Sequence, residues 1–397
     1  MIRLDPAQLG ESVWDAAIIG AGPAGGFGAA LLAERGGKVL LLDKSSWPRH
    51  KVCGGCLNAA AVQLLAECGL NETLEGSQPI HRVAWRVGGQ ILNMAAPGGA
   101  AILRREFDAA LIEAAIERGA VFIPNCAATV LPTDRSESFR TLALQVGGEM
   151  HNIRSRAILA CDGVNGTSLA EEHWAAWHVA PDAWIGVAAT LPQFATASFH
   201  PGEIHMHIGD GGYAGVVRLP NGETHIAAAL DPVACRKSGG PAALIRNILE
   251  SCGISSGEVR CTGHFAGTGF LARRRRHFGA HRVFAVGDAC GYVEPFTGEG
   301  MAWAMQSARA AVELLPAPEA EWPADLHERW RALHSETIGK SQRFCRLLRP
   351  VLHRPGMAST AVFIGRALPP LSDFIGRHIA QPRVSFAATG VSQGGAA

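Results

Sequence analysis

Three glycines and one aspartate near the start of the chain have the types and spacing needed to hold a dinucleotide. Gly20, Gly22 and Gly25 form a G-x-G-x-x-G pattern, and Asp43 follows 18 residues after the third glycine. The first glycine permits a tight turn, the second lets the backbone approach a pyrophosphate, and the third allows close helix packing. A carboxylate at Asp43 can accept hydrogen bonds from ribose hydroxyls. These residues therefore predict a nucleotide cofactor.

The elements that must position these residues occur in one unbroken run. Residues 15–44, DAAIIGAGPAGGFGAALLAERGGKVLLLDK, indicate a strand, a glycine turn, a helix and a second strand. The N-terminus of such a helix presents free N–H groups and the positive end of its dipole to phosphates. Because the strand, the helix and the acidic residue are all present, we favour a binding role over a glycine turn that only packs.

The overall composition is typical of a folded enzyme. The chain has 397 residues, a net charge of +1, 48% hydrophobic and 18% charged residues. We expect one large domain or two closely joined ones, and no binding of nucleic acid. The sequence has no apolar run of membrane-spanning length and no signal-peptide pattern, and its ten cysteines are scattered. We therefore expect a cytoplasmic protein with reduced thiols.

Two aspartate–glycine pairs follow later predicted strands. Asp162 and Gly163 come after the apolar stretch RAILAC, and Gly287 and Asp288 come after VFAV. Asp288 is placed to hydrogen-bond ribityl hydroxyls of a cofactor. A glycine loop and a helix start then follow, with Pro295, Gly298, Gly300 and Met301. Such a loop and helix N-terminus can stabilise negative charge on a reduced ring.

With Arg104 in the segment LRREFDAALIEAA, these motifs resemble those of FAD-dependent oxidoreductases of the p-hydroxybenzoate hydroxylase class. The resemblance covers about residues 13–335 and is closest to the geranylgeranyl reductase branch. It implies FAD as the cofactor, and NAD(P)H or another reductant as a transient electron donor. The implied cofactor-binding residues are Gly20, Gly22, Ala24, Gly25, Asp43, Lys44, Arg104, Asp162, Gly163, Gly287, Asp288, Pro295, Gly298, Gly300 and Met301.

Departures from other branches support this placement. The loop Gly298-Glu299-Gly300-Met301-Ala302 differs from the G-Q-G-x-N loop of aromatic hydroxylases and is similar to that of the reductase-like branch. The segment GGYAGVVRLP lacks the tryptophans that flavin halogenases carry there. The resemblance therefore disfavours halogenation.

The segment PRHKVCGGCLNAAAVQLL, residues 48–65, is similar to the K-x-C-G signature of the same family. The resemblance implies that Cys53 faces the flavin or the substrate, and that Lys51 and Arg49 supply positive charge. We take Cys53 and Lys51 as the candidate catalytic residues. The thiol either donates a proton to a substrate carbanion or shapes the pocket. The alternative is a small buried hydrophobe, as free cysteine often is.

Cys53 and Cys56 also form a C-x-x-C pattern. A zinc site needs two further ligands at matching spacing, and none follows, so we predict no metal site. A redox dithiol is disfavoured because the surrounding pattern is not that of a thioredoxin-like unit.

The predicted fold class is α/β (α+β), with a Rossmann-like FAD-binding domain and an inserted mixed or antiparallel substrate sheet. We assign residues 1–80, 100–175 and 271–335 to the FAD-binding domain, and 81–99 and 176–270 to the substrate domain. Residues 336–397 are expected to form a helical C-terminal region with a mobile tail. Within the sheet, His205 and His207 share one face and are interpreted as surface or packing residues.

Two arginine-rich stretches have less specific interpretations. Arg273–Arg276 is interpreted as a solvated loop, and the alternative is recognition of phosphates of NADPH, an acyl carrier or a membrane surface. The segment after residue 335 is predicted to form short helices broken at Pro350, Pro355 and Pro369. It would enclose an apolar ligand, form a dimer surface or lie on a membrane.

We therefore predict an FAD-dependent oxidoreductase that acts on a hydrophobic small molecule or lipid. The leading reaction is reduction of a carbon–carbon double bond of a prenyl or related lipid. One alternative is a monooxygenase of aromatic or polyketide-derived lipids, and another is a non-catalytic prenyl-binding escort protein. Peripheral contact with a membrane is a further expectation, and the sequence leaves the oligomeric state open.

Overall fold

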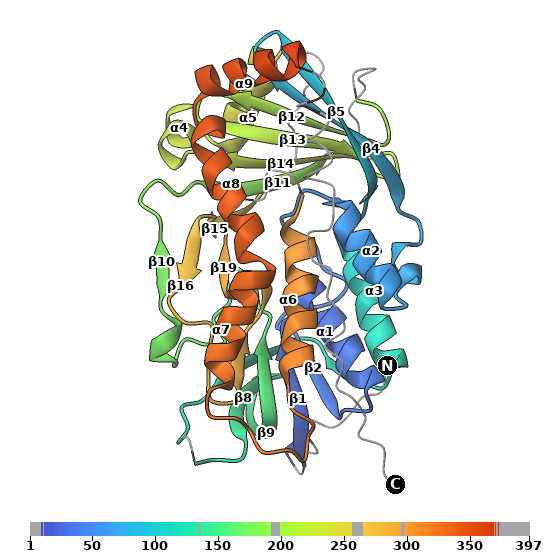
Figure 1. Ribbon diagram of the computed structural model, residues 1–397, viewed down its shortest axis with the longest axis vertical. Helices are drawn as coiled ribbons and strands as arrows, with labels where there is room; N and C mark the ends of the chain where they lie inside the picture. The colour runs from blue at the N-terminus through green and yellow to red at the C-terminus, as the bar shows by residue number, and fades with distance from the viewer. Residues whose placement is uncertain are drawn as a thin grey trace.

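The structure is a computed structural model. It describes residues 9–10, 12–134, 136–191, 199–255, 265–294, 298–368, 370 and 372. Figure 1 shows two sheets stacked along the long axis of the molecule, with helices packed beside both.

The first sheet has the order β17-β18-β9-β1-β2-β6, parallel from β18 to β6 and antiparallel between β17 and β18, and a hairpin of β7 and β8 extends it through β9. Runs such as VLLL in β2 are buried throughout, as expected for parallel strands covered on both faces. The strands are β1 (Val13–Ile19), β2 (Val39–Leu42), β6 (Val121–Ile123), β7 (Cys126–Val130), β8 (Arg140–Val146), β9 (Glu149–Ala160), β17 (Gly279–Ala280) and β18 (Val283–Ala285).

Small residues let three helices pack closely on this sheet. Helix α1 (Pro23–Glu34) contacts both α3 (Arg104–Glu117) and α6 (Gly300–Leu314). Gly26 faces Leu111 of α3, and Gly28 faces Ala308 of α6. Helix α7 (Leu326–Thr337) packs on α6. The N-terminus of α2 (Ala59–Glu67) is capped by Asn58, whose side chain accepts a hydrogen bond from the Ala61 N–H.

The second sheet has the order β15-β11-β14-β13-β12-β4-β5-β3 and is antiparallel except between β12 and β4. Its strands are β3 (Cys56–Leu57), β4 (Gln78–Val87), β5 (Gln90–Ala101), β11 (Ile185–Leu191), β12 (Glu203–Gly209), β13 (Gly212–Arg218), β14 (Thr224–Leu230) and β15 (Ala266–Phe270). The predicted mixed or antiparallel sheet, and with it the fold class, is confirmed.

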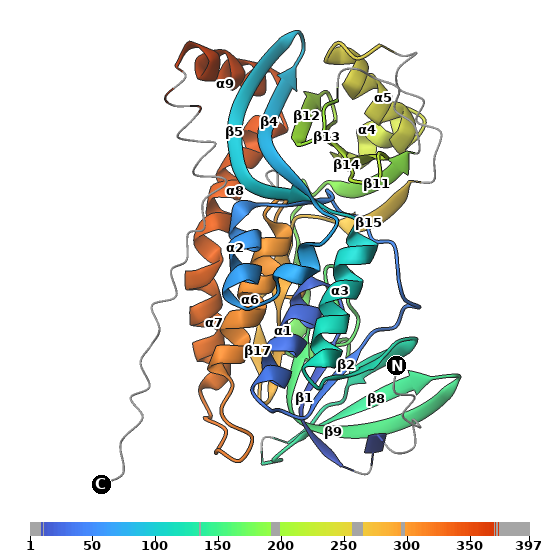
Figure 2. The ribbon, with the colours of Figure 1, turned by 90° about the vertical axis from the view of Figure 1, so that its right-hand side faces the viewer.

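Each face of the second sheet is covered by a different pair of helices. Helices α4 (Pro232–Lys237) and α5 (Pro241–Ser251) bury one face, as Figure 2 shows beside β11 to β14. Helices α8 (Gly339–Leu352) and α9 (Pro355–Ala367) contribute Leu352, Ala358 and Val362 to the apolar cluster on the other face.

Two predictions for arginine- and proline-rich stretches are wrong. Pro350 lies inside α8, whose last turn continues to Leu352, whereas Pro355 starts α9 as predicted and Pro369 lies outside the described residues. The stretch taken as a solvated loop forms β16 (Arg273–Arg275) in a small sheet with β10 (Trp177–Val179) and β19 (Gly291–Tyr292). Arg275 is buried because the Ala289 carbonyl accepts its Nε–H at 2.7 Å and its guanidinium lies over the Trp177 ring.

Within the described ranges, no helix combines the length and the apolar character needed to cross a bilayer.

Candidate functional site

The turn between β1 and α1 has the close backbone contacts that its glycines predict. Gly20 has a φ of +97°, and a Cβ there would lie 2.6 Å from the carbonyl oxygen of Cys161. A Cβ at Gly25 would lie only 1.8 Å from the carbonyl oxygen of Gly20. Gly22 precedes α1 and has no side chain to cap it. The first-turn N–H groups of α1 are therefore left for an anionic ligand.

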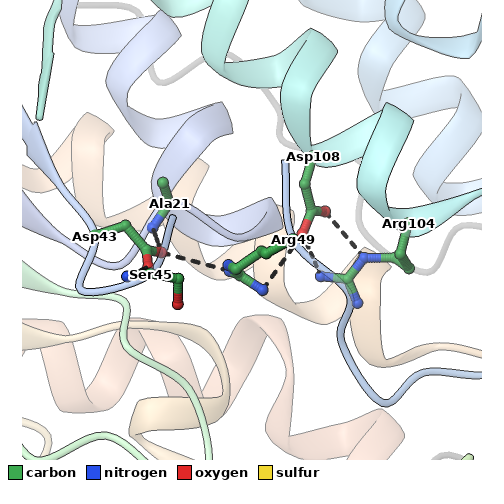
Figure 3. Close-up of polar contacts among 6 residues, drawn as sticks. All are labelled: Ala21, Asp43, Ser45, Arg49, Arg104 and Asp108. Atoms are coloured by element: carbon green, nitrogen blue, oxygen red, sulfur yellow. Dashed lines mark hydrogen bonds and ion pairs between the residues drawn. The ribbon is translucent and has the colours of Figure 1, made fainter. Parts of the chain in front are cut away.

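A chain of ion pairs connects the end of β2 to α3, as Figure 3 shows. Asp43 Oδ2 accepts a hydrogen bond of 2.9 Å from the Ala21 N–H and lies 3.5 Å from Arg49 Nη2. Arg49 Nη1 lies 4.0 Å from Asp108, which accepts two hydrogen bonds from Arg104, at 2.9 and 2.7 Å. Asp108 is fully buried. The network therefore fixes Arg49 and Arg104 beside the glycine turn.

Asp108 was not predicted, although the segment LRREFDAALIEAA that contains Arg104 also contains it. Its spacing of four residues from Arg104 places both on one helix face, and this was the available signal. Arg49 was predicted only as a positive charge near the flavin. The structure shows that it also bridges two carboxylates.

The two aspartate–glycine pairs lie at the ends of neighbouring parallel strands. Asp162 Oδ2 accepts a hydrogen bond of 2.9 Å from the Ser168 N–H, and its Oδ1 is buried without a hydrogen-bond partner in the described part of the chain. Gly287 has a φ of +63° and donates its N–H to Ser307 Oγ of α6 at 2.9 Å. The carboxyl ends of the strands thus bring both pairs to one edge of the sheet.

Lys51 and Asp288 shift each other's pKa in the cavity. Burial lowers the pKa of Lys51, and the positive charges of Arg49 and Arg104 lower it further, whereas Asp288 raises it. Burial raises the pKa of Asp288 from 3.8 to about 6, against the opposing effect of Lys51 and Arg104. Buried groups with such shifted pKa values are typical of functional sites.

Cys53 lies in a loop whose conformation is held by contacts from three sides. Its Sγ accepts a hydrogen bond of 3.4 Å from the Gly55 N–H and interacts with the Arg104 guanidinium. The Cys53 carbonyl oxygen is 2.5 Å from His225 Nε2 on β14. His225 was not predicted as a site residue, because a contact across 172 positions has no local sequence signal.

Cys56 differs from Cys53 in its surroundings. It is buried, and this burial raises the pKa of its thiol to about 12, with a smaller effect from Cys53. The two cysteines are not joined in a disulfide. Gly298 packs directly on Cys56, since a Cβ there would lie 2.9 Å from Sγ.

One cavity joins these groups to the second sheet. Ten predicted site residues line it: Gly22, Ala24, Lys51, Cys53, Arg104, Gly163, Asp288, Gly298, Gly300 and Met301. Five other predicted site residues do not line the cavity and lie in the turns and strand ends next to it: Gly20, Gly25, Asp43, Asp162 and Gly287. Lys44 is exposed and does not line the cavity, and Pro295 lies outside the described residues.

The far side of the cavity is largely apolar. It is formed by side chains of β4, β5, β12 and β13, including Val83, Trp85, Met94, Ile204 and Met206. The only two tyrosines of the sequence, Tyr213 and Tyr292, also line it. Tyr292 was not predicted, although it follows the Gly287-Asp288 motif by only four positions.

The paired histidines of β12 are packing residues rather than surface residues. His205 and His207 are 2% and 0% exposed, and both rings contact Phe199. Burial lowers the pKa of His205 to about 4 and that of His207 to about 3. Glu203 Oε2, from two residues earlier on the strand, lies 3.4 Å from His205 Nε2.

The residues fit FAD. The uncapped helix N-terminus and glycine turn suit its pyrophosphate, and the half-buried Asp288 carboxylate lies where ribityl hydroxyls are expected. The positive charges of Lys51 and Arg104 suit a reduced, anionic ring. We identify the glycine turn, the Asp288 edge and the facing cavity as the candidate FAD and substrate site.

Comparison with known proteins supports FAD as the cofactor. The family model described as "FAD binding domain" matches residues 14–332. The chain is 26% identical over 386 residues to menaquinone reductase of Mycobacterium tuberculosis, covering 87% of this chain and 86% of that protein. It is also 26% identical over 387 residues to kynurenine 3-monooxygenase of Salinispora arenicola, covering 89% and 84%.

The fold is similar to that of a flavoprotein/dehydrogenase from Cytophaga hutchinsonii. The TM-score is 0.77 at 18% identity, and the match covers 93% of each chain. The predicted FAD cofactor and the predicted enzymatic class are therefore confirmed. The chain belongs to the FAD-binding domain family and is an FAD-dependent oxidoreductase.

Proposed function

We propose that the protein reduces a carbon–carbon double bond of a prenyl chain or a related lipid, as in the geranylgeranyl reductase branch. The observation that carries this proposal is the cavity, which runs from the predicted flavin site to an apolar wall of the second sheet. Desolvation of an apolar chain on such a wall contributes about 25 cal/mol for each Å² buried. The wall therefore favours an apolar substrate over a polar one.

Cys53 is the group we assign to proton transfer. FAD, when bound and reduced, supplies hydride to the substrate, which leaves a carbanion that must be protonated. The Cys53 thiol lines the cavity and is an acid of suitable reach. Arg104 lies beside the sulfur that becomes negatively charged after the proton has left, and it stabilises that charge.

Lys51 and Arg104 supply positive charge to the site. Arg104 is fixed by its pair with Asp108, and Lys51 lines the cavity near Asp288. They compensate the negative charge of the cofactor, and Asp288 holds its hydroxyls. NAD(P)H or another reductant would regenerate the reduced cofactor by transient docking.

The named relatives support a quinone or lipid substrate for this chain. Two relatives that are each 26% identical and cover 87% of this chain are named menaquinone reductase. The direct test is anaerobic incubation of reduced enzyme with prenylated quinones and prenyl diphosphates, followed by mass spectrometry. Gain of two hydrogen atoms in the prenyl chain supports the proposal, and recovery of every lipid with its chain unchanged contradicts it.

A monooxygenase is the second candidate. The observation that favours it is the comparable 26% identity to kynurenine 3-monooxygenase, over nearly the same length. In this case, incubation with labelled oxygen and an aromatic lipid inserts one oxygen atom into the product. The same cavity would then hold the aromatic ring beside Tyr213 and Tyr292.

A further inference from the structure

Positive charge is concentrated in the part of the chain that forms α8 and α9. From residue 338 to residue 372 the sequence has six Lys or Arg residues and neither Asp nor Glu. The whole chain has a net charge of only +1, so removal of these six positive charges leaves −5 for the rest. This region therefore differs in charge from the remainder of the molecule.

Most of these cations point to solvent. Arg349 turns inward, where it lies 3.4 Å from the buried Glu294 and 3.1 Å from Asp182. The other five are exposed and have no ion-pair partner within the described part of the chain: Lys340, Arg343, Arg346, Arg354 and Arg366. Arg346 lies near the charges of Arg274 and Arg343. Arg274 of β16 thus extends the cluster.

Large apolar side chains are exposed among these cations. Leu347 of α8 is 76% exposed, and Phe363 of α9 is 64% exposed. Met357 and Ile364 are both 43% exposed. On α9 these side chains lie on the opposite side of the helix from Ala358 and Val362, which pack on the second sheet. The helix therefore has one apolar face in the core and another in solvent.

We propose that the α8–α9 surface, defined by Arg343, Arg346, Leu347, Phe363 and Ile364, binds the surface of a bilayer that contains anionic lipids. Exposed apolar side chains on a helix can insert at the boundary between headgroups and acyl chains. Arginines beside them are attracted to anionic headgroups, each by about 1 kcal/mol. The surface offers both kinds of contact.

The charges disfavour two other occupants. A second copy of the chain would bring the same positive surface against this one, and like charges repel. Residues 373–397 contain Arg377, Arg383 and Asp373 as their charged residues, so this segment brings no net negative charge. An anionic bilayer supplies negative charge for the arginines and an apolar interior for the exposed apolar side chains.

The position of the surface fits a protein that takes its ligand from lipid. Helix α9 packs on β4, β5 and β12, the strands that supply much of the apolar cavity wall. Figure 2 shows α9 at the end of the molecule beside β4 and β5. The proposal itself does not depend on which reaction the flavin carries.

The test is cosedimentation of the FAD-loaded, full-length protein with vesicles of phosphatidylcholine alone, or of equal parts phosphatidylcholine and phosphatidylglycerol. We expect binding to the anionic vesicles and release at high salt. The variant R343E/R346E and the variant F363S should each bind these vesicles at least about tenfold more weakly than the unmodified protein. Flavin absorbance of each variant verifies that it is folded.

Two variants elsewhere in the molecule serve as matched controls. R329E/R331E reverses two exposed charges on α7, and M150S removes a side chain of β9 that is 64% exposed, like Phe363. Both should bind as the unmodified protein does. The proposal is overturned if the protein does not bind anionic vesicles, or if the surface variants bind as well as the controls. It is also overturned if F363S dissociates a dimer, or abolishes capture of a protein partner, while vesicle binding is unaffected.

Discussion

His225 Nε2 lies 2.5 Å from the carbonyl oxygen of Cys53, so a strand of the second sheet holds the loop that carries the candidate proton donor. A carbonyl oxygen only accepts hydrogen bonds, and Nε2 must therefore carry the proton. In the neutral ring Nδ1 is then an acceptor, and it lies 2.9 Å from Thr190 Oγ1. Burial lowers the pKa of His225, which favours this neutral form.

Replacement of His225 tests whether this contact positions Cys53. Loss of one partner from a buried hydrogen bond costs about 1–3 kcal/mol. We expect His225→Phe to lower kcat about tenfold while the protein keeps its flavin. His225→Gln, whose amide can still donate to the carbonyl, should recover most of the activity. Equal kcat values for His225→Phe and the unmodified enzyme would show that the contact is dispensable.

Cys53→Ala tests the proton donor directly. Loss of a general acid typically lowers the rate about 100-fold or more, and we expect this effect on turnover without release of flavin. Cys56→Ala is the matched control, because burial raises the pKa of that thiol to about 12 and keeps its proton in place. If Cys53→Ala has unchanged kinetics, Cys53 is a packing residue.

Asp288→Ala tests the assignment of the cofactor hydroxyl site. Asp288 lines the cavity directly after Gly287, at the edge where the strands of the first sheet end. We expect the variant to be purified largely without FAD, as measured by the ratio of absorbance at flavin and protein wavelengths. A fully yellow, active Asp288→Ala protein would show that the ribityl site lies elsewhere.

The raised pKa of Asp288 has a consequence for stability in the flavin-free protein. Burial raises this pKa from 3.8 to about 6, so the folded state binds the proton more tightly than the unfolded state. Ionisation of this carboxylate in the folded state lowers the free energy of unfolding. This loss is absent below about pH 4, grows between about pH 4 and about pH 6, and stays constant at higher pH, at about 3 kcal/mol. Asp288→Asn should therefore raise the free energy of unfolding at pH 8 but not at pH 4. An equal effect at both pH values would contradict this account.

Two glycines of α1, Gly25 and Gly28, provide a test of the close contact in the glycine turn together with its control. A Cβ at Gly25 would lie 1.8 Å from the Gly20 carbonyl oxygen, so Gly25→Ala must displace the turn. We expect a loss of flavin and a lower melting temperature. A Cβ at Gly28 would meet Ala308 at an ordinary 3.5 Å, and Gly28→Ala should be tolerated or stabilise α1 by up to about 1 kcal/mol. Equal behaviour of the two variants would argue against the close contact.

The fold class was predictable because its signals are local. The run from Asp15 to Lys44 contains a strand, a turn, a helix and a second strand, each with its own periodicity and glycine pattern. The cavity-lining positions of Lys51, Cys53 and Arg104 agree with the resemblance to the family. Their roles remain predictions.

The rest of the site depends on contacts between distant positions. His225 meets Cys53 only because β14 folds over the loop, and no periodicity reports this. Arg275 appeared to be a solvated charge because sequence alone does not show the Ala289 carbonyl and the Trp177 ring that accommodate it. Pro350 was taken as a helix break, but α8 ends only two residues later, so little helix is lost.

Reaction of the reduced enzyme with oxygen tests the central claim most directly. The purified protein is reduced anaerobically, mixed with oxygen in a stopped-flow instrument in the presence of a prenylated lipid, and followed from the near ultraviolet to the visible. The proposed double-bond reductase should return slowly to the oxidised spectrum in one step, and a parallel mixture of reduced enzyme and lipid without oxygen should contain the reduced lipid. A transient absorbance band that belongs to neither the oxidised nor the reduced enzyme, together with an oxygenated product, would contradict the account and establish a monooxygenase.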